Sequence, residues 1–265
     1  MKYIFSLFAI LMSLHANVIE SPLLSVDNKK EVATISIDKI DLGMSGFVYH
    51  VLAPKHTSIL KSAVVTQYNE ETKIATLKLS DYDGLNNNSL PKGKWSLQVG
   101  DIAVFAFGYN RSVLVAPSEE IYHQITKSVR TQWVHPDLFA TILSFRGHPT
   151  PLKSDFDAMG VATSVGLLFI YLDKKVYMLD IKSFKILSIS DAPLVQDSVK
   201  LPFYSRVEEI DANWFGEGSD VLEAYEPHYY GLLVKFNKEN KKLHDNIANS
   251  DKKSHYLLKQ FKLGN

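Results

Sequence analysis

Cysteine is absent from this sequence of 265 residues. Its absence excludes disulfide scaffolds, thiolate-bound zinc, iron–sulfur clusters and cysteine nucleophiles. An excess of one charge is also missing, because 29 lysines and arginines balance 29 aspartates and glutamates. A chain without a global basic field lacks the usual means of attracting a nucleic-acid backbone, so we expect no nucleic-acid partner.

Long apolar runs are missing from the body of the chain. The longest such stretch after residue 16 covers residues 161–172 and contains Thr163, Ser164 and Gly166. Twelve residues are too few to span a bilayer, so we interpret this stretch as buried core. The 46% hydrophobic and 22% charged composition is that of an ordinary folded protein. The length predicts one or two domains.

The first sixteen residues have the three parts of a secretory signal. Lys2 provides a short charged region, residues 4–14 are apolar, and Ala16 is small enough to precede a signal-peptidase cut. We therefore predict a signal peptide over residues 1–16. The exported chain would then lie at the cell surface, in the outer membrane or in the periplasm.

Residues 17–117 contain patterns typical of short strands. Residues 32–40 and 73–79 alternate apolar and polar side chains, as half-buried strands do. The β-branched and aromatic content indicates further strands at residues 46–52, 62–68, 95–97, 101–107 and 111–116. We predict a small antiparallel β-barrel or sandwich for this first domain.

Residues 118–236 form the second predicted domain, an α+β unit. Ser118 is a good N-cap for a first helix, Pro136 starts a second that Gly147 ends, and Ser154-Asp155 start a third. Strands are expected at residues 167–172, 176–181, 185–190 and 206–210. A helix follows at residues 219–226, where Pro227 stops it, and a last strand is expected at residues 229–236. The predicted fold class is thus β-rich α+β.

Residues 237–265 form a basic, lysine-rich tail. Residues 235–265 carry eight lysines and three acidic residues, a net charge of +5, whereas residues 17–234 carry 20 basic and 26 acidic residues, a net charge of −6. We predict a short helix from Ser250-Asp251 to Gly264. Its apolar face contains Leu257, Leu258 and Phe261, and its basic face contains Lys252, His255, Lys259 and Lys262.

Three roles for this tail remain open. The helix can dock on the body with its lysines in water, attach to an anionic membrane surface, or present lysines to a partner protein.

Signatures of catalysis are weak. His135, Asp137, His148, Asp155 and Asp157 carry groups that bind zinc, but their spacing matches no ligand pair on one helical face, and capping and turn roles are favoured. The Asp81–Gly84 loop resembles a calcium loop only superficially. We expect no enzyme, metal or cofactor. A metal-dependent hydrolase that uses the histidines and aspartates above stays the least favoured alternative.

Aromatic residues are abundant, with three tryptophans and 13 tyrosines. Trp133 and Trp214 are candidates for a ligand-stacking surface, although such residues more often fill cores and interfaces.

Three segments carry a resemblance to a known family: residues 131–139 (TQWVHPDLF), 143–153 (LSFRGHPTPLK) and 166–172 (GLLFIYL). Together with the exported, cysteine-free, β-rich first half, they resemble the N-terminal region of the plasminogen-binding surface proteins of Gram-negative bacteria. The resemblance covers roughly residues 17–236. It implies a cell-surface or periplasm-facing protein that binds host plasminogen.

The kringle modules of plasminogen bind lysine, with carboxylates for the ammonium, an aromatic floor for the stem and a cationic patch for a carboxylate. The sequence ends in Asn265, so we expect an internal lysine beside an acid to serve, such as Lys241 with Asp245, or Lys252 and Lys253 beside Asp251. The candidate binding residues are Lys241, Lys252, Lys253, Lys259 and Lys262. The alternative is a periplasmic assembly or scaffold protein that binds other envelope proteins.

Overall fold

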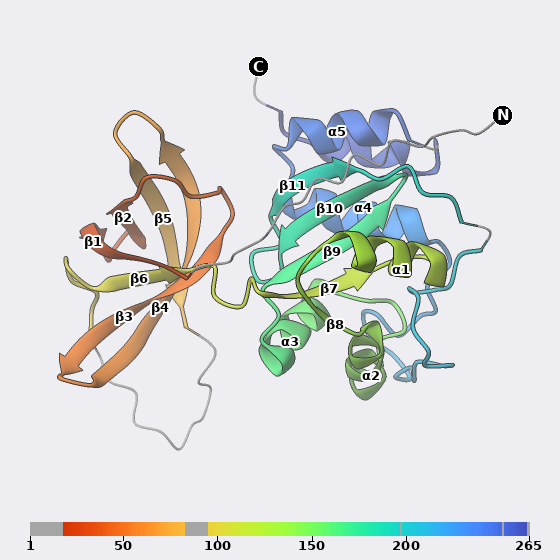
Figure 1. The fold of residues 1–265 in the computed structure, drawn as a ribbon, viewed down its shortest axis with the longest axis horizontal. Helices are drawn as coiled ribbons and strands as arrows, with labels where there is room; N and C mark the ends of the chain where they lie inside the picture. The colour runs from red at the N-terminus through yellow and green to blue at the C-terminus, as the bar shows by residue number, and fades with distance from the viewer. Residues whose placement is uncertain (1–17, 83–94, 197, 251, 264–265) are drawn as a thin grey trace.

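The computed structural model describes residues 18–82, 95–196, 198–250 and 252–263 (Figure 1). The fold is β-rich α+β, with a closed antiparallel barrel followed by a five-stranded sheet and its helices. This architecture confirms the predicted fold class. The predicted signal peptide and residues 83–84 of the calcium-like loop lie outside the described residues.

Six antiparallel strands close the barrel in the order β1-β2-β5-β4-β3-β6. Their bounds are β1 (Ile19–Asp27), β2 (Val32–Ser36), β3 (Ser45–Ala53), β4 (His56–Asn69), β5 (Ile74–Asp81) and β6 (Ile102–Phe105). Successive side chains of each strand point alternately into and out of the barrel. In β5, Ala75, Leu77 and Leu79 are buried, whereas Lys78 is exposed. Two hairpin turns use an aspartate or asparagine side chain that accepts backbone N–H groups, at Asp27 and Asn69.

The second sheet has the order β11-β10-β9-β7-β8. Its strands are β7 (Arg111–Val115), β8 (Gln132–Val134), β9 (Leu167–Leu172), β10 (Lys175–Asp180) and β11 (Ile186–Asp191). β7 runs parallel to β8 and β9, and β9 to β11 form the predicted antiparallel meander. β7 belongs to this sheet, although the sequence pattern grouped residues 111–116 with the strands of the first domain.

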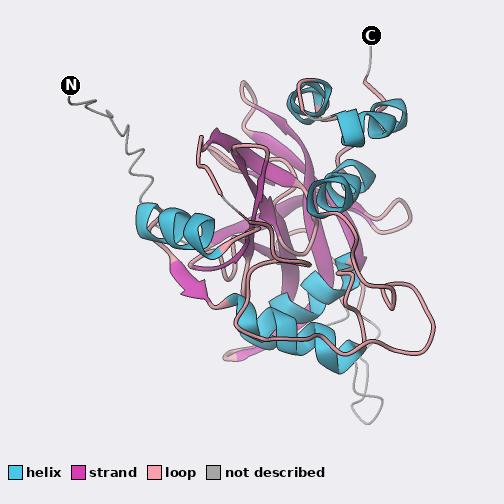
Figure 2. Ribbon diagram, turned by 90° about the vertical axis from the view of Figure 1, so that its right-hand side faces the viewer, coloured by secondary structure: helices cyan, strands magenta, loops and turns pink. Residues whose placement is uncertain are grey.

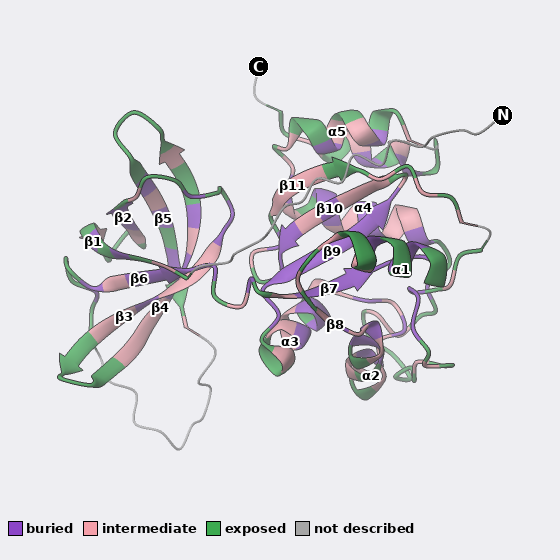
Figure 3. Ribbon diagram, in the orientation of Figure 1, coloured by how far each residue is buried: buried purple, intermediate pink, exposed green. Residues whose placement is uncertain are grey.

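Helices cover both faces of the second sheet (Figure 2). α1 (Glu119–Ser128) packs with Leu114 and Phe169 on one face. α2 (Pro136–Arg146), α3 (Lys153–Thr163) and α4 (Tyr225–Phe236) pack on the other, with Val113 and Leu168. Because both faces are covered, every residue of β9 is buried (Figure 3).

The helix starts follow the sequence signals. The Ser118 hydroxyl accepts from the Ile121 N–H at 3.3 Å, Pro136 is the first residue of α2, and Gly147 ends α2 at φ 69°. α3 starts at Lys153, where the Asp155 carboxylate accepts from the Leu152 N–H at 2.7 Å.

Three predicted elements near the end of the second domain are wrong. Residues 206–224 contain neither the expected strand nor the expected helix, and residues 229–236 are helical as part of α4. Pro227 lies in the first turn of α4, where its missing N–H costs nothing. Tyr225, Tyr229 and Leu233 repeat every four residues and are buried, so their helical spacing prevails over their strand propensity.

Asp180, at the end of β10, joins the two parts of the molecule. Its buried carboxylate accepts from the Ser45 N–H at 2.9 Å, the Ser45 hydroxyl at 2.6 Å and the Tyr109 hydroxyl at 2.8 Å. The Ser183 N–H donates to its other oxygen at 2.7 Å. The barrel is therefore held on the second sheet by a fully hydrogen-bonded buried charge.

No helix in the described part of the chain has the length and apolar character needed to cross a membrane.

Candidate functional site

The tail folds into two helices instead of the single one predicted. α5 (Lys241–Ala248) starts at Asn240, whose side chain accepts from the Leu243 N–H at 2.9 Å. Leu243 and Ile247 are completely buried in the core shared with α4. The sequence pattern missed α5 because its apolar stripe is only two residues long.

The second tail helix, η1 (Lys252–Gln260), is a 3₁₀-helix. It docks on the body through buried Ser254 and Leu257, while Leu258 and Phe261 pack against the core at its edge. Of the roles left open for the tail, docking of these apolar residues on the body is therefore observed. The tail is part of the folded domain.

The 3₁₀ geometry changes which lysines share a face. With three residues per turn, positions i and i+3 are aligned, so Lys253, Tyr256 and Lys259 lie in one row, and all three are exposed. The expected α-helical face that joins Lys252, His255, Lys259 and Lys262 does not form. His255 instead bonds the Ser250 carbonyl at 3.1 Å through Nε2.

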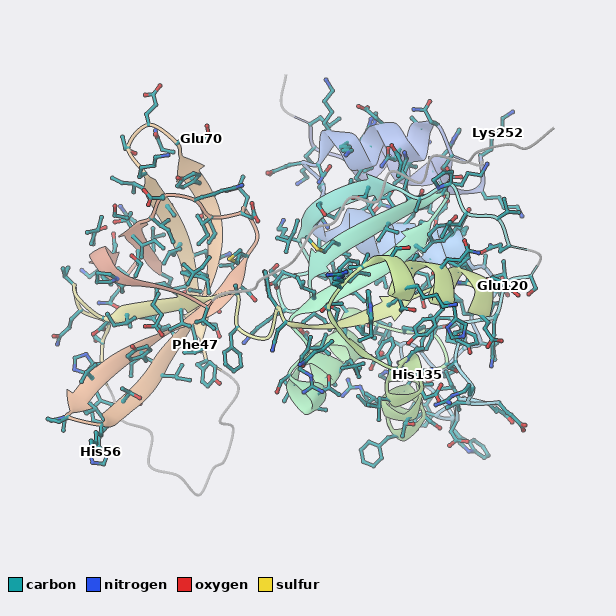
Figure 4. The ribbon with its side chains drawn as sticks, in the orientation of Figure 1. Phe47, His56, Glu70, Glu120, His135 and Lys252 are labelled. Carbon is teal, nitrogen blue, oxygen red and sulfur yellow. The ribbon has the colours of Figure 1, made fainter. Side chains whose placement is uncertain are left out.

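The candidate lysines are exposed, and among the described residues none of their ammonium groups has an ion pair or hydrogen bond. They are Lys241, Lys252, Lys253, Lys259 and Lys262. Lys252 lies at the outer edge of the molecule in Figure 4. Nearby Lys242 differs, because its ammonium donates to the Ile189 carbonyl of the edge strand β11 at 2.9 Å. We call the five free lysines the C-terminal lysine surface.

Lys241 and Asp245 place one cationic and one anionic side chain on α5. They lie one helical turn apart and are both exposed, and no ion pair joins them in the structure. Lysine N-terminal to aspartate is the less favourable order for such a pair, and a cation in the first turn opposes the helix dipole. Local helix stability therefore does not explain Lys241, whose charge faces solvent, whereas Asp245 Oδ1 lies 3.2 Å from His244 Nδ1.

The histidines and aspartates of the hydrolase alternative have structural partners. His135 caps α2 by accepting from the Asp137 N–H at 3.2 Å, and Asp137 pairs with Arg206 at 2.7 Å. Asp155 accepts from Arg146 at 2.5 Å and from His148 at 2.8 Å. No group of three or more acidic or histidine side chains suited to a metal ion is found in the described ranges.

The pKa values in this region follow from these contacts. Burial lowers the pKa of His135, against the opposing charge of Asp137. Burial would raise the pKa of Asp137, but hydrogen bonds from the Arg206 backbone and guanidinium outweigh it and lower the pKa. Both groups are thus held in the charge states that suit a helix cap: a neutral imidazole and an ionised carboxylate.

A cavity of about 530 Å³ lies where the barrel meets α3 and the end of β10. Phe47, Phe107 and Val161 supply apolar walls, and Phe47 is labelled in Figure 4. Lys153 on its rim is engaged, since its ammonium bonds Asp157 at 2.5 Å and the Lys182 carbonyl at 2.6 Å.

The structure therefore defines a β-rich, two-part protein that presents lysines on a docked C-terminal segment. Comparison with protein families matches residues 18–233 to the family described as plasminogen-binding protein pgbA N-terminal. The chain belongs to this family, as the sequence resemblance indicated. The C-terminal lysine surface lies beyond the matched residues.

Two curated relatives are plasminogen-binding proteins PgbA of Helicobacter pylori, from strains J99 and 26695. Each is 30% identical over 224 residues, which is 82% of this chain and 47% of the relative. The chain thus spans about half the length of these relatives. No solved structure matches this chain.

The structure separates the two tryptophans that the sequence analysis considered for a ligand-stacking surface. Trp214, one of the two tryptophans considered for a stacking surface, is 100% exposed, whereas Trp133 is partly buried. Trp214 lies in residues 206–224, where Gly216 and Gly218 and the lack of apolar periodicity are the available signals for an irregular loop.

Proposed function

We propose that this chain is an exported protein that binds plasminogen at the cell surface through its C-terminal lysine surface. The observation that carries the proposal is membership of a plasminogen-binding protein family over residues 18–233. The hydrolase alternative has no such observation behind it, because the described residues contain no cluster of side chains suited to a metal ion.

The chemistry of the surface supports the lysines as the contact. A kringle holds a ligand that carries a cation and an anion a short distance apart. Lys241 and Asp245 offer both charges from one helix: the Lys241 ammonium has no ion pair among the described residues, and the Asp245 carboxylate keeps one oxygen free beside its 3.2 Å contact with His244 Nδ1. Lys253, Tyr256 and Lys259 form a second exposed row, on η1.

The test is binding of plasminogen to the purified full chain, with and without 6-aminohexanoic acid. We expect saturable binding that the lysine analogue abolishes. The Lys241→Ala and Asp245→Asn variants should each weaken binding, and Lys252→Ala/Lys253→Ala/Lys259→Ala should weaken it further, by roughly tenfold in total if these residues are the main contacts.

The matched control replaces three exposed lysines of the barrel: Lys29→Ala/Lys39→Ala/Lys78→Ala. These changes remove the same net charge and should leave plasminogen binding unchanged. Equal losses in the barrel and tail variants would contradict a localised site. Binding that resists 6-aminohexanoic acid would contradict recognition by kringles.

The proposed location has its own test. N-terminal sequencing of the exported chain should begin at Asn17, and protease treatment of intact cells should remove the protein. An intact Met1, or full protection from protease, would contradict display at the surface.

A further inference from the structure

Residues 206–224, which we call the acidic aromatic loop, present large apolar side chains to solvent. Trp214 is 100% exposed, Phe215 88% and Val221 73%. Phe145, at the adjoining end of α2, is 94% exposed. Exposed aromatic residues gathered in one place are typical of protein-binding surfaces.

Hydrogen bonds hold the loop in this conformation. Asp211 and Ser144 bond twice, side chain to side chain at 2.6 Å and backbone N–H to hydroxyl at 3.0 Å. Asn213 donates to the Arg146 carbonyl from its side chain and to the Gly147 carbonyl from its backbone. Trp214 therefore follows an anchored residue and lies beside the end of α2.

A second pair of hydrogen bonds anchors the loop further along the chain. The Thr150 N–H donates to the Gly218 carbonyl at 3.1 Å, and its hydroxyl donates to the Asp220 carbonyl at 2.6 Å. A loop fixed at both ends loses little conformational entropy on binding, so its exposed aromatic groups are ready to contact a partner.

The loop is strongly acidic. Six acidic residues and one arginine give residues 206–224 a net charge of −5, and the six carboxylates are on exposed residues: Glu208, Glu209, Asp211, Glu217, Asp220 and Glu223. Arg206 is already paired with Asp137. This surface favours a cationic partner that also offers apolar or aromatic contacts.

The same chain carries the complementary surface. Residues 235–265 have a net charge of +5, and Lys253 and Lys259 flank Tyr256, which is 58% exposed. α5 and α2 lie at opposite ends of the second part of the molecule (Figure 1). The acidic aromatic loop adjoins α2, so it cannot reach the lysines of its own chain.

We propose that the acidic aromatic loop of one molecule docks the C-terminal lysine surface of a second copy, head to tail. The two contacting patches differ, so the contact is heterologous and leaves one free loop and one free lysine surface on every dimer. Association therefore continues into longer open assemblies. This inference does not depend on plasminogen binding, although a kringle and a second copy would compete for the same lysines.

Sedimentation velocity of the purified full chain tests the proposal. We expect the average mass to rise with protein concentration at about 50 mM NaCl and to fall at about 300 mM NaCl, where screening weakens the charge pairing. Trp214→Ser/Phe215→Ser should raise the apparent dissociation constant roughly tenfold. Lys252→Ala/Lys253→Ala/Lys259→Ala should do the same.

Mixing these two variants distinguishes the head-to-tail contact from a symmetric one. The loop variant keeps its lysines and the lysine variant keeps its loop, so the mixture should form a dimer and stop there. The control Val51→Ser/Leu52→Ser removes exposed apolar side chains from the barrel and should associate like the wild type. All changed residues are exposed, so thermal unfolding should stay unchanged.

Three results would overturn the proposal: a monomer at every concentration, unchanged association of the loop variant, or no dimer in the mixture. None of these results bears on plasminogen binding, because the loop variant retains every lysine of the proposed kringle contact.

Discussion

One buried residue, Asp180, determines how the barrel and the second sheet meet. Asp180 accepts four hydrogen bonds from three elements, including β3 of the barrel and the segment before β7. Burial of the phenol, together with the charge of Asp180, raises the pKa of Tyr109 far above the usual range, so this hydroxyl stays a donor.

Replacing Asp180 by alanine should destabilise the protein by about 3 kcal/mol, because Ser45 and Tyr109 would keep buried donors without an acceptor. Urea denaturation measures the change. The control Asp191→Ala removes an exposed partner of Lys175 and should cost less than about 1 kcal/mol. Similar losses in both variants would contradict the role of Asp180 as the joint.

His228 makes stability depend on pH. Burial in α4 lowers its pKa, against the smaller effect of the Pro151 carbonyl, to which Nε2 donates at 2.9 Å. A lowered pKa means that the folded state favours the neutral ring. Its contribution is complete above the unfolded pKa of about 6.5 and is lost as the pH falls through the folded pKa.

The His228→Gln variant should therefore lose less stability than the wild type between about pH 7.5 and about pH 5. Denaturant unfolding at both pH values gives the comparison, with the surface variant His123→Gln as control. A His228→Gln curve parallel to that of the wild type would rule out this contribution.

At the scale of elements, local signals and tertiary packing agree for most helices and disagree for α4. Ser118, Pro136 and Gly147 are found at the caps that their residue types indicate, since capping depends on atoms within a few residues. Residues 229–236 of α4 are expected as a strand from the sequence, after a helix that ends at residue 226. Packing of Tyr229, Tyr230 and Leu233 against the second sheet decides its helical state.

Gly231 offers a test of α4 as a helix. It lies within Tyr225–Phe236, and an added Cβ would meet no atom within 4 Å. Gly231→Ala should stabilise the protein by about 0.5 to 1 kcal/mol, because alanine loses less backbone entropy in a helix. Urea unfolding measures the gain.

The matched control is Gly160→Ala in α3, where the new Cβ would lie 3.2 Å from Ile181 and 3.3 Å from the Val165 carbonyl. This crowding should cancel the gain. Stabilisation by Gly160→Ala but not by Gly231→Ala would contradict the assigned packing of both helices.

At the scale of the whole molecule, the C-terminal segment is part of the core. Leu243, Ile247 and Leu257 belong to the same cluster as Tyr229 and Leu233. The basic residues of α5 and η1 are therefore presented on a folded support, and point substitutions are the appropriate way to test them.

Ending the chain after Phe236 should lower the free energy of unfolding by roughly 5 kcal/mol, since three large buried side chains are lost. Thermal and urea unfolding of the shortened chain measure this loss. The triple lysine variant described above keeps these side chains and should unfold like the wild type. Wild-type stability of the shortened chain would show that α5 and η1 do not pack as described.

The sequence by itself determined the fold class, most strands, the helix caps and the family, because alternation, capping and turn chemistry act over short stretches of chain. It also identified the apolar face of η1, formed by Leu257, Leu258 and Phe261. Tertiary structure alone decided that β7 joins the second sheet, that residues 229–236 are helical, and that Trp214 is exposed. These outcomes depend on contacts between segments far apart in the chain, and no local pattern records which surfaces such contacts cover.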